Sequence, residues 1–171
     1  MKKLRTYMII LLALGMAACT PQGDKCPEVD FDKELSDIRT VLEQYELARE
    51  SEDFATVENL WASEADIVLF GTEGDEQLVG IESIKKAMSR QFDEVENTLI
   101  NISDQKIRIN REGTTAWFSE VLDYNFIYLG ENMAFEGIRF TGVLEKFDGK
   151  WKLVQGHLSV PYEADFEETT E

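Results

Sequence analysis

The last predicted strand of the chain carries its only histidine, His157. This strand spans residues 150–161 and follows Asp148-Gly149, a dipeptide that favours a tight hairpin turn. Histidine is the side chain whose charge ordinarily changes near neutral pH, so any proton-transfer chemistry in this protein is expected at His157. The alternative is a structural histidine that bonds to nearby backbone in a half-buried strand.

Side chains on a strand alternate between two faces, and the two faces of this one differ in polarity. The mostly apolar face, which could equally belong to a core, consists of Lys152, Val154, Gly156, Leu158 and Val160. The face that mixes apolar and polar groups, as the lining of a pocket does, consists of Trp151, Leu153, Gln155, His157 and Ser159.

The preceding predicted strand, residues 133–147, places Arg139 and Thr141 on one face. Whether Arg139 meets His157 depends on the turn between the strands. A two-residue loop sets Arg139 opposite Leu158, whereas a three-residue loop sets it opposite His157. The sequence leaves both registers open.

The sequence contains no motif for several other common chemistries. The segment Gly71-Thr-Glu-Gly74 lacks the lysine and the spacing of a phosphate-binding loop. One histidine and no cysteine pair do not indicate a zinc site, and no serine lies in a nucleophile elbow. The sequence therefore predicts no metal and no cofactor.

The amino terminus has the pattern of an export signal. Lys2, Lys3 and Arg5 precede a short apolar run over residues 7–16, too short to span a bilayer. The segment that ends at Cys19 resembles the bacterial lipobox, which implies cleavage after residue 18 and acylation of Cys19. We expect a lipoprotein anchored to the cell envelope, in the outer membrane and facing the periplasm. Ordinary cleavage with release of a secreted product is the alternative.

The chain is strongly acidic, with 17 basic and 34 acidic residues and a net charge of −17. Loss of the three basic leader residues would bring the charge to about −20. Such a surface repels nucleic acid, so no nucleic-acid partner is expected. Residues 19–30 are predicted to be a flexible tether, in which Cys26 has no partner if Cys19 is acylated, and residues 163–171 an acidic tail.

Residues 31–162 are predicted to form one α+β domain. Apolar residues at helical spacing predict helices over 31–50, from Phe54 to Trp61, and from Ile81 to Phe92, with a short strand at 67–70. After residue 97 the period changes to two, which predicts strands over 99–110, 114–129, 133–147 and 150–161. We expect three N-terminal helices packed on a strongly curved antiparallel sheet, a cone-shaped barrel with an internal pocket.

The order of these elements resembles the SnoaL-like branch of the nuclear-transport-factor-two-like superfamily, the cystatin-like α+β cone. The resemblance covers nearly all of residues 31–162. It depends on the opening amphipathic helix, Trp61 at the end of the second, Gly80-Ile81 opening the third, Thr115-Ala116-Trp117-Phe118, Arg139-Phe140-Thr141 and the closing segment from Gly149 to Pro161. It implies a bent sheet wrapped around a long helix, a cavity at the open end, and a homodimer formed through the sheet.

The resemblance also guides the choice of site residues. It implies that His157 acts as a general base or hydrogen-bond donor, with Asp66 or Asp123 orienting the imidazole or acting as the base. Arg139 would hold an anionic or carbonyl group that Thr141 and Ser159 orient. The apolar walls would be Trp61, Trp117 and Tyr124. In the structural alternative, Trp61 and Trp117 belong to the core and Arg139 pairs with Glu120 or Glu136.

Three functions are compatible with this reading, because the family's fold hosts both enzymes and binding proteins. The first is binding of a small, partly apolar molecule without turnover. The second is proton-transfer catalysis of the isomerase, dehydratase or cyclase type with His157. The third is a dimeric interaction module without a ligand. We expect the first, and therefore expect that the protein is not an enzyme.

Overall fold

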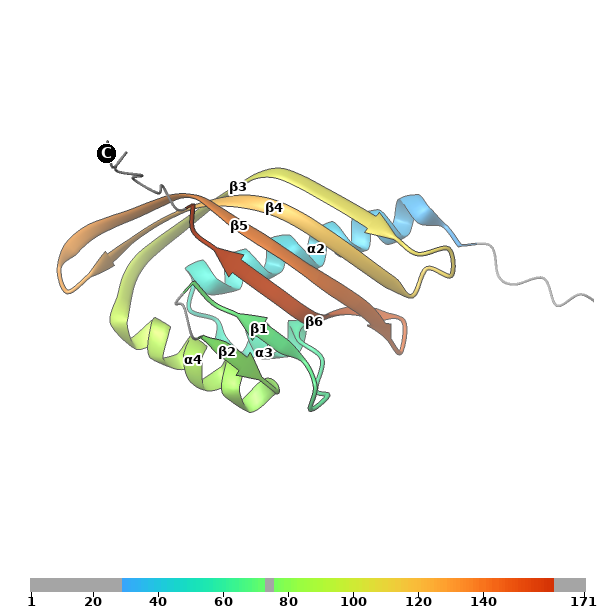
Figure 1. Ribbon diagram of the computed structural model, residues 1–171, viewed down its shortest axis with the longest axis horizontal. Coiled ribbons are helices and arrows are strands. Elements are labelled where there is room, and N and C mark those ends of the chain that lie inside the picture. The colour runs from blue at the N-terminus through green and yellow to red at the C-terminus, as the bar shows by residue number, and fades with distance from the viewer. Residues whose placement is uncertain (1–28, 73–75, 162–171) are drawn as a thin grey trace, which may run out of the picture.

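Three helices lie against a curved six-stranded sheet (Figure 1). The computed structural model describes residues 29–72 and 76–161. The helices are α2 (Phe31–Glu50), α3 (Phe54–Leu60) and α4 (Ile81–Glu94). The strands are β1 (Val68–Phe70), β2 (Gln77–Val79), β3 (Val95–Ile109), β4 (Thr115–Tyr128), β5 (Glu131–Phe147) and β6 (Lys150–Ser159). The α+β prediction is confirmed.

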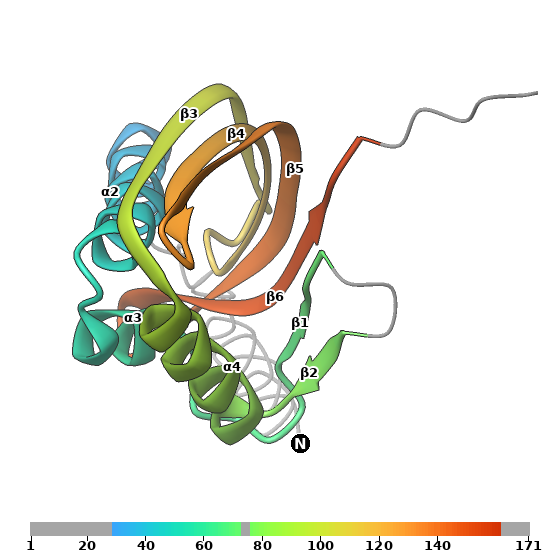
Figure 2. The ribbon, with the colours of Figure 1, turned by 90° about the vertical axis from the view of Figure 1, so that its left-hand side faces the viewer.

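The strands follow the order β2-β1-β6-β5-β4-β3, and all neighbours are antiparallel except β1 and β6, which are parallel. Seen end-on, β3 to β6 curve around instead of lying flat (Figure 2). The expected barrel is not closed, since β2 and β3 form the two edges of the sheet. The short strand β2 is not among the strands that the sequence predicts.

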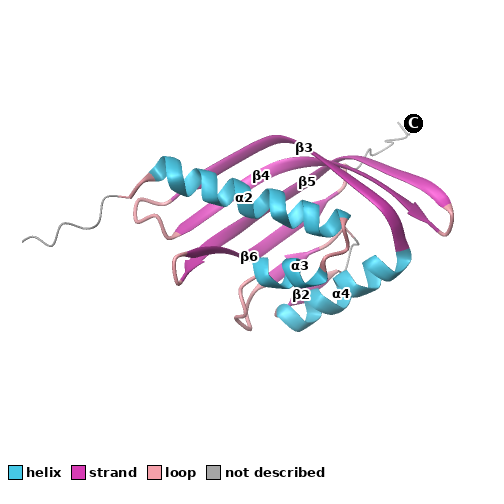
Figure 3. Cartoon of the chain, turned by 180° about the vertical axis from the view of Figure 1, so that it is seen from behind, coloured by secondary structure: helices cyan, strands magenta, loops and turns pink. Residues whose placement is uncertain are grey.

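Helix α2 begins where the sequence predicts, because Asp30 caps it. The Asp30 carboxylate accepts a hydrogen bond from the Lys33 backbone N–H at 3.1 Å. The helix then crosses the concave face of the sheet (Figure 3). At its start, the Trp151 indole N–H donates to Glu34 at 2.7 Å; at its end, the Ile100 N–H donates to Glu50 at 2.6 Å. Both ends of α2 are thus tied to the sheet.

The main core lies between α2 and the concave face, where Tyr45, Phe140, Leu122 and Leu144 are almost completely buried. The Tyr45 ring stacks on Phe140 at 5.9 Å, and Phe118 meets Phe140 edge-on at 4.9 Å. Gly142 is needed here, because a Cβ at that position would lie 2.6 Å from the Phe118 ring. Burial of these aromatic side chains holds the helix to the sheet.

A β-bulge in β6 changes which side chains face inward. Val143 on β5 pairs with Gln155 and Leu144 with Leu153, so Val154 has no partner on β5. Trp151 and Leu153 before the bulge are buried, and so are Gly156 and Leu158 after it. The expectation that Gln155, His157 and Ser159 share a face with Trp151 and Leu153 is therefore wrong, because one extra residue shifts the alternation.

Among the helices in residues 29–72 and 76–161, none is both long enough and apolar enough to cross a membrane. The predicted leader, Cys19, the tether as far as residue 28 with Cys26, and the acidic tail lie outside the described residues.

Candidate functional site

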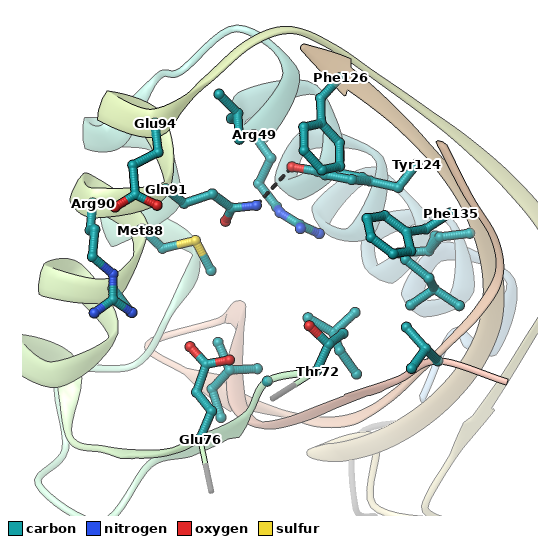
Figure 4. Close-up of a pocket in the computed structure, with 18 of the residues that line it drawn as sticks. Arg49, Thr72, Glu76, Met88, Arg90, Gln91, Glu94, Tyr124, Phe126 and Phe135 are labelled. Atoms are coloured by element: carbon teal, nitrogen blue, oxygen red, sulfur yellow. Dashed lines mark hydrogen bonds between the residues drawn. The ribbon is translucent and has the colours of Figure 1, made fainter. Parts of the chain in front are cut away.

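A cavity of about 470 Å³ opens between α4 and the concave face of the sheet (Figure 4). Its apolar wall comes from the sheet on one side and α4 on the other. These apolar lining residues are Leu69, Leu78, Ala87, Met88, Val95, Leu122, Phe126, Phe135, Ile138, Leu158 and Val160. Phe126 and Phe135 stack with ring centroids 5.9 Å apart, so neighbouring strands present one continuous aromatic surface.

Arg49, from the last turn of α2, supplies a buried charge to this cavity. It is only 5% exposed, and its Nη1 donates to Glu46 Oε2 at 2.9 Å. Its guanidinium carbon lies 5.7 Å from the Tyr45 ring centroid and 5.2 Å from that of Tyr124. The Nε atom is buried and has no hydrogen-bond partner among the described residues.

Burial acts to lower the pKa of Arg49, but the neighbouring Glu46 carboxylate and the Tyr124 and Tyr45 hydroxyls hold it above its ordinary value. The guanidinium therefore stays charged at every physiological pH. Burial raises the pKa of Glu46, and Arg49 opposes that shift.

Gln91 and Tyr124 link the two walls of the cavity. The Gln91 amide on α4 donates to the Tyr124 hydroxyl oxygen on β4 at 2.8 Å (Figure 4). A phenolic hydroxyl that accepts one bond keeps its own proton to donate. Arg49, Gln91 and Tyr124 therefore place hydrogen-bond donors beside the apolar side chains of the lining.

Glu120 lies deeper in the core, on the inward face of β4 and outside the cavity lining. It is 2% exposed and accepts a bond from the Gln105 amide at 2.8 Å through Oε2, while Oε1 has no partner among the described residues. Burial raises the pKa of Glu120 to about 7; nearby Glu46 adds to the shift, and Gln105 and Arg49 oppose it. This carboxyl group is thus poised to exchange a proton near neutral pH.

His157 does not line the cavity. Its side chain is exposed on the outer face of β6, and its ring meets Phe70 edge-on at 5.8 Å between centroids. The two-residue turn is present, since Phe147 pairs with Lys150. Because of the bulge, however, His157 lies opposite Thr141, which neither predicted register had given it as a partner.

The structure brings His157 together with three other predicted site residues, but on this outer face. Arg139 pairs with Ser159 and Thr141 with His157; Arg139 and Thr141 are exposed, and Ser159 is half-buried. Among the described residues Arg139 forms no ion pair, neither with Glu120 nor with Glu136. Roles for these residues in binding stay predictions, and the cavity gives them no support.

The remaining predicted residues are scattered. Tyr124 lines the cavity, as a wall residue should. Trp61 is 2% exposed and packs edge-on against Tyr45 at 6.2 Å, in the core. Trp117 is 50% exposed on the outer face of β4. Asp66 is exposed in the turn before β1, and Asp123 accepts a bond from the Gly137 N–H at 3.0 Å.

Sequence reasoning missed Arg49, Glu46, Gln91 and Glu120. A signal for two of them was present. Arg49 continues the apolar stripe of α2, eleven residues after Ile38 along positions 38, 42, 45 and 49. Glu120 interrupts an apolar alternation between Phe118 and Leu122. A charge within an apolar periodicity indicates a buried ionisable group.

Within residues 29–72 and 76–161, no group of three or more His, Cys, Asp or Glu side chains is arranged to hold a metal ion.

Comparisons with known proteins support the fold. The sequence profile of the SnoaL-like domain matches residues 38–163. No curated protein sequence matches the chain significantly. An NTF2-like superfamily protein from Salmonella enterica superposes with a TM-score of 0.71 at 13% identity, covering 82% of this chain and 99% of that one.

Two further solved structures are similar. A proposed dehydratase of the NTF2-like family from Streptomyces avermitilis has a TM-score of 0.69 at 17% identity, with 77% of this chain and 99% of that one covered. A proposed scytalone dehydratase from Novosphingobium aromaticivorans has the same score and identity, covering 80% and 90%. At such identities the likeness shows the fold alone.

Proposed function

The chain belongs to the SnoaL-like domain family, and on that premise we propose that it binds a small, partly apolar molecule in the cavity without converting it. One observation carries the proposal: a cavity of about 470 Å³ in which apolar side chains from the sheet and α4 lie beside polar groups, among them Arg49, Gln91 and Tyr124. Sites for small molecules have this size and this mixture, in which the apolar surface supplies affinity and the polar groups orientation.

Binding without turnover is favoured because, among the described residues, no buried carboxylate and no imidazole lines the cavity. His157 and Asp66, the predicted catalytic residues, are exposed and do not line it. Of the lining carboxylates, Glu94 is exposed and Glu76 only half-buried.

A proton-transfer enzyme is the second candidate, favoured by one observation. Burial gives Glu120 a pKa of about 7, the value that suits a general acid or base near neutral pH. Since Glu120 does not line the cavity, catalysis would need a proton path past Arg49 or Tyr124.

Binding can be tested with N-phenyl-1-naphthylamine, a neutral apolar dye whose fluorescence rises in apolar surroundings. Ala87→Phe, on the cavity side of α4, should abolish the saturable signal by filling the space. Ser89→Phe adds the same ring on the exposed side of α4 and should leave the signal unchanged. Equal signals from both variants would contradict binding in the cavity.

We further propose that Cys19 carries a lipid anchor that holds the domain at the outer membrane, facing the periplasm. The support is the sequence alone: the basic start, the short apolar run and small residues before Cys19. Metabolic labelling with an alkyne fatty acid should mark the wild-type protein and not Cys19→Ala. Equal labelling, or release of both into the soluble fraction, would refute the anchor.

The homodimer is also a proposal. The outer face of the sheet exposes Trp117 and Phe70, apolar side chains that a partner copy could cover. Sedimentation at several concentrations, with Trp117→Glu as the dissociating variant, tests it.

A further inference from the structure

The guanidinium of Arg49 has more donors than its protein partner uses. Arginine carries five N–H donors in a planar fork. Glu46 takes one bond, from Nη1 to Oε2, and the buried Nε has no partner among the described residues. Two tyrosine rings lie close to the guanidinium, those of Tyr45 and Tyr124. Nε is closed off from solvent, but Glu46 also leaves three of the four Nη N–H donors unused, and Arg49 lines the cavity. Buried N–H donors without an acceptor cost free energy, so a ligand acceptor that meets these Nη groups would be stabilising.

The charges of the lining differ between its depth and its mouth. Among the residues that the structure describes, four charged side chains line the cavity: Arg49, Glu76, Arg90 and Glu94. Arg90 and Glu94 are exposed, and they lie on α4 across the cavity from Glu76 (Figure 4). Arg49 alone among the four is almost completely buried. At depth, where interactions are screened least, the lining therefore presents the guanidinium of Arg49, whose charge is shared with the Glu46 carboxylate behind it.

A second donor lies beside Arg49. The Tyr124 hydroxyl accepts from Gln91 and has its own proton free to donate. The unpartnered carboxylate oxygens nearby, Glu46 Oε1 and Glu120 Oε1, belong to residues that do not line the cavity. A ligand that reaches this end meets donors and a positive charge, which suits a carboxylate and disfavours an ammonium group.

The other end of a ligand would lie on apolar surface. Met88 on α4 and the stacked pair Phe126 and Phe135 line the space in front of Arg49 (Figure 4). A compact hydrocarbon or aromatic body fits this surface, and methionine adapts its shape to such a body.

We propose that the ligand of this cavity is a monocarboxylate with a compact apolar body, and that Arg49 binds its carboxylate with help from the Tyr124 hydroxyl. This inference rests on the proposed binding function and names the chemical class that the cavity selects. Arg139, the arginine that the sequence had suggested for this task, lies exposed on the opposite face of the sheet.

The test uses three probes with one carbon skeleton: 4-phenylbutanoate, 4-phenylbutanamide and 4-phenylbutan-1-amine. Their dissociation constants for the full chain are measured by calorimetry at pH 7.5. We expect the acid to bind at least tenfold more tightly than the amide, and the amine to bind most weakly. The Nε–Hε resonance of Arg49 should shift on addition of the acid and not of the amide.

The variants separate the two arginines. Arg49→Ala alone would leave Glu46 buried without its partner, so the double variant Arg49→Gln with Glu46→Gln removes both charges and keeps the side-chain volumes. It should bind acid and amide equally, with amide affinity near that of the wild type. Arg139→Gln, the matched change on the outer face, should keep the full preference for the acid. If the double variant does not fold, the Arg49 resonance and Arg49→Lys, expected to reduce the preference at least threefold, decide the question.

The outcomes distinguish a failure of the carboxylate inference from a failure of the proposed small-molecule binding. Equal binding of acid and amide by the wild type would overturn the carboxylate inference and leave small-molecule binding intact. Tightest binding by the amine, or a preference for the acid that Arg139→Gln abolishes, would also overturn it. Failure of all three probes and of the neutral dye to bind would overturn both.

Discussion

Two groups of polar residues lie on opposite faces of the same sheet. On the concave side, Arg49 and Glu46 form an ion pair in which both residues are at most 5% exposed. On the convex side, His157 and Arg139 are exposed to water. By residue type the convex group looks like the active site, because it holds the only imidazole in the chain.

The difference between the two faces is burial. Helix α2 packs against the concave face, and this packing removes Glu46 on the helix and Glu120 on β4 from water. The pKa values of both carboxyl groups therefore rise. Charges on the convex group are screened by solvent, and each contributes little to binding or stability. Residue types suggest which chemical groups are available, but the side of the sheet decides which of these groups are buried beside the cavity.

The largest expected effect comes from Arg49→Ala. Glu46 would be left as a buried carboxylate without its partner, which costs about 3 to 5 kcal/mol of unfolding free energy. Urea denaturation followed by circular dichroism measures the loss. The double variant Arg49→Gln with Glu46→Gln should recover most of it. A loss no larger in Arg49→Ala than in Arg139→Ala would erase the contrast between the two faces.

Next in size is the pH dependence due to Glu120. Its pKa rises on folding from an ordinary 4.5 to about 7, so the folded state binds the proton more tightly. The stabilisation is complete below about pH 4.5 and is lost as the pH rises through 7, a change of about 3 kcal/mol. Glu120→Gln should flatten the decline in stability between pH 5 and pH 8, as urea midpoints would show.

The exposed glutamate Glu136 on β5 provides the control, since Glu136→Gln should leave the slope of stability against pH unchanged. A Glu120→Gln protein that declines as steeply as the wild type would show that the buried carboxyl group does not titrate in this range.

A smaller effect is expected from Tyr124→Phe, which removes the acceptor of the Gln91 amide and keeps the ring beside Arg49. The loss of one such hydrogen bond costs about 1 kcal/mol. Tyr128→Phe, near the exposed end of β4, is the control and should cost almost nothing. The midpoints of thermal unfolding are compared for the wild type, Tyr124→Phe and Tyr128→Phe at equal concentration. Equal midpoints would argue against the Gln91 contact.

The smallest effect is expected from His157→Gln. An exposed side chain whose main contact is the Phe70 ring should change stability by no more than about 0.5 kcal/mol. Binding of N-phenyl-1-naphthylamine should also be unchanged. Lost binding in this variant would place the functional site on the convex face and reverse the comparison.

Much of the fold could be predicted, because it follows from patterns close together in the chain. The stripe of apolar residues predicts α2 with its observed bounds, Phe31–Glu50, and the structure adds Asp30 as its cap. Asp148-Gly149 predicts the hairpin, and both residues adopt the positive φ angles, 49° and 78°, that such a turn requires. Strand β2 was not predicted because its three residues form a strand only by pairing with β1, which lies on the other side of the intervening loop.

The candidate site was predicted only in part. Tyr124 was named, but Arg49, Gln91 and Glu46 were not. The alternation in the closing strand was correct up to Leu153 and failed beyond it, because the bulge at Val154 leaves no mark in the residue types.

The order of residues alone determined the helices and the long strands, since helical and extended periodicity are local properties of the chain. It also determined that imidazole, guanidinium and carboxylate groups would be present. Only the tertiary structure decided which of these groups are enclosed. Packing between segments far apart in sequence decides the bulge, the open sheet edge and the crossing of α2 over the concave face. The bulge alone, one unpaired residue at Val154, turns His157 to the solvent and Leu158 to the cavity.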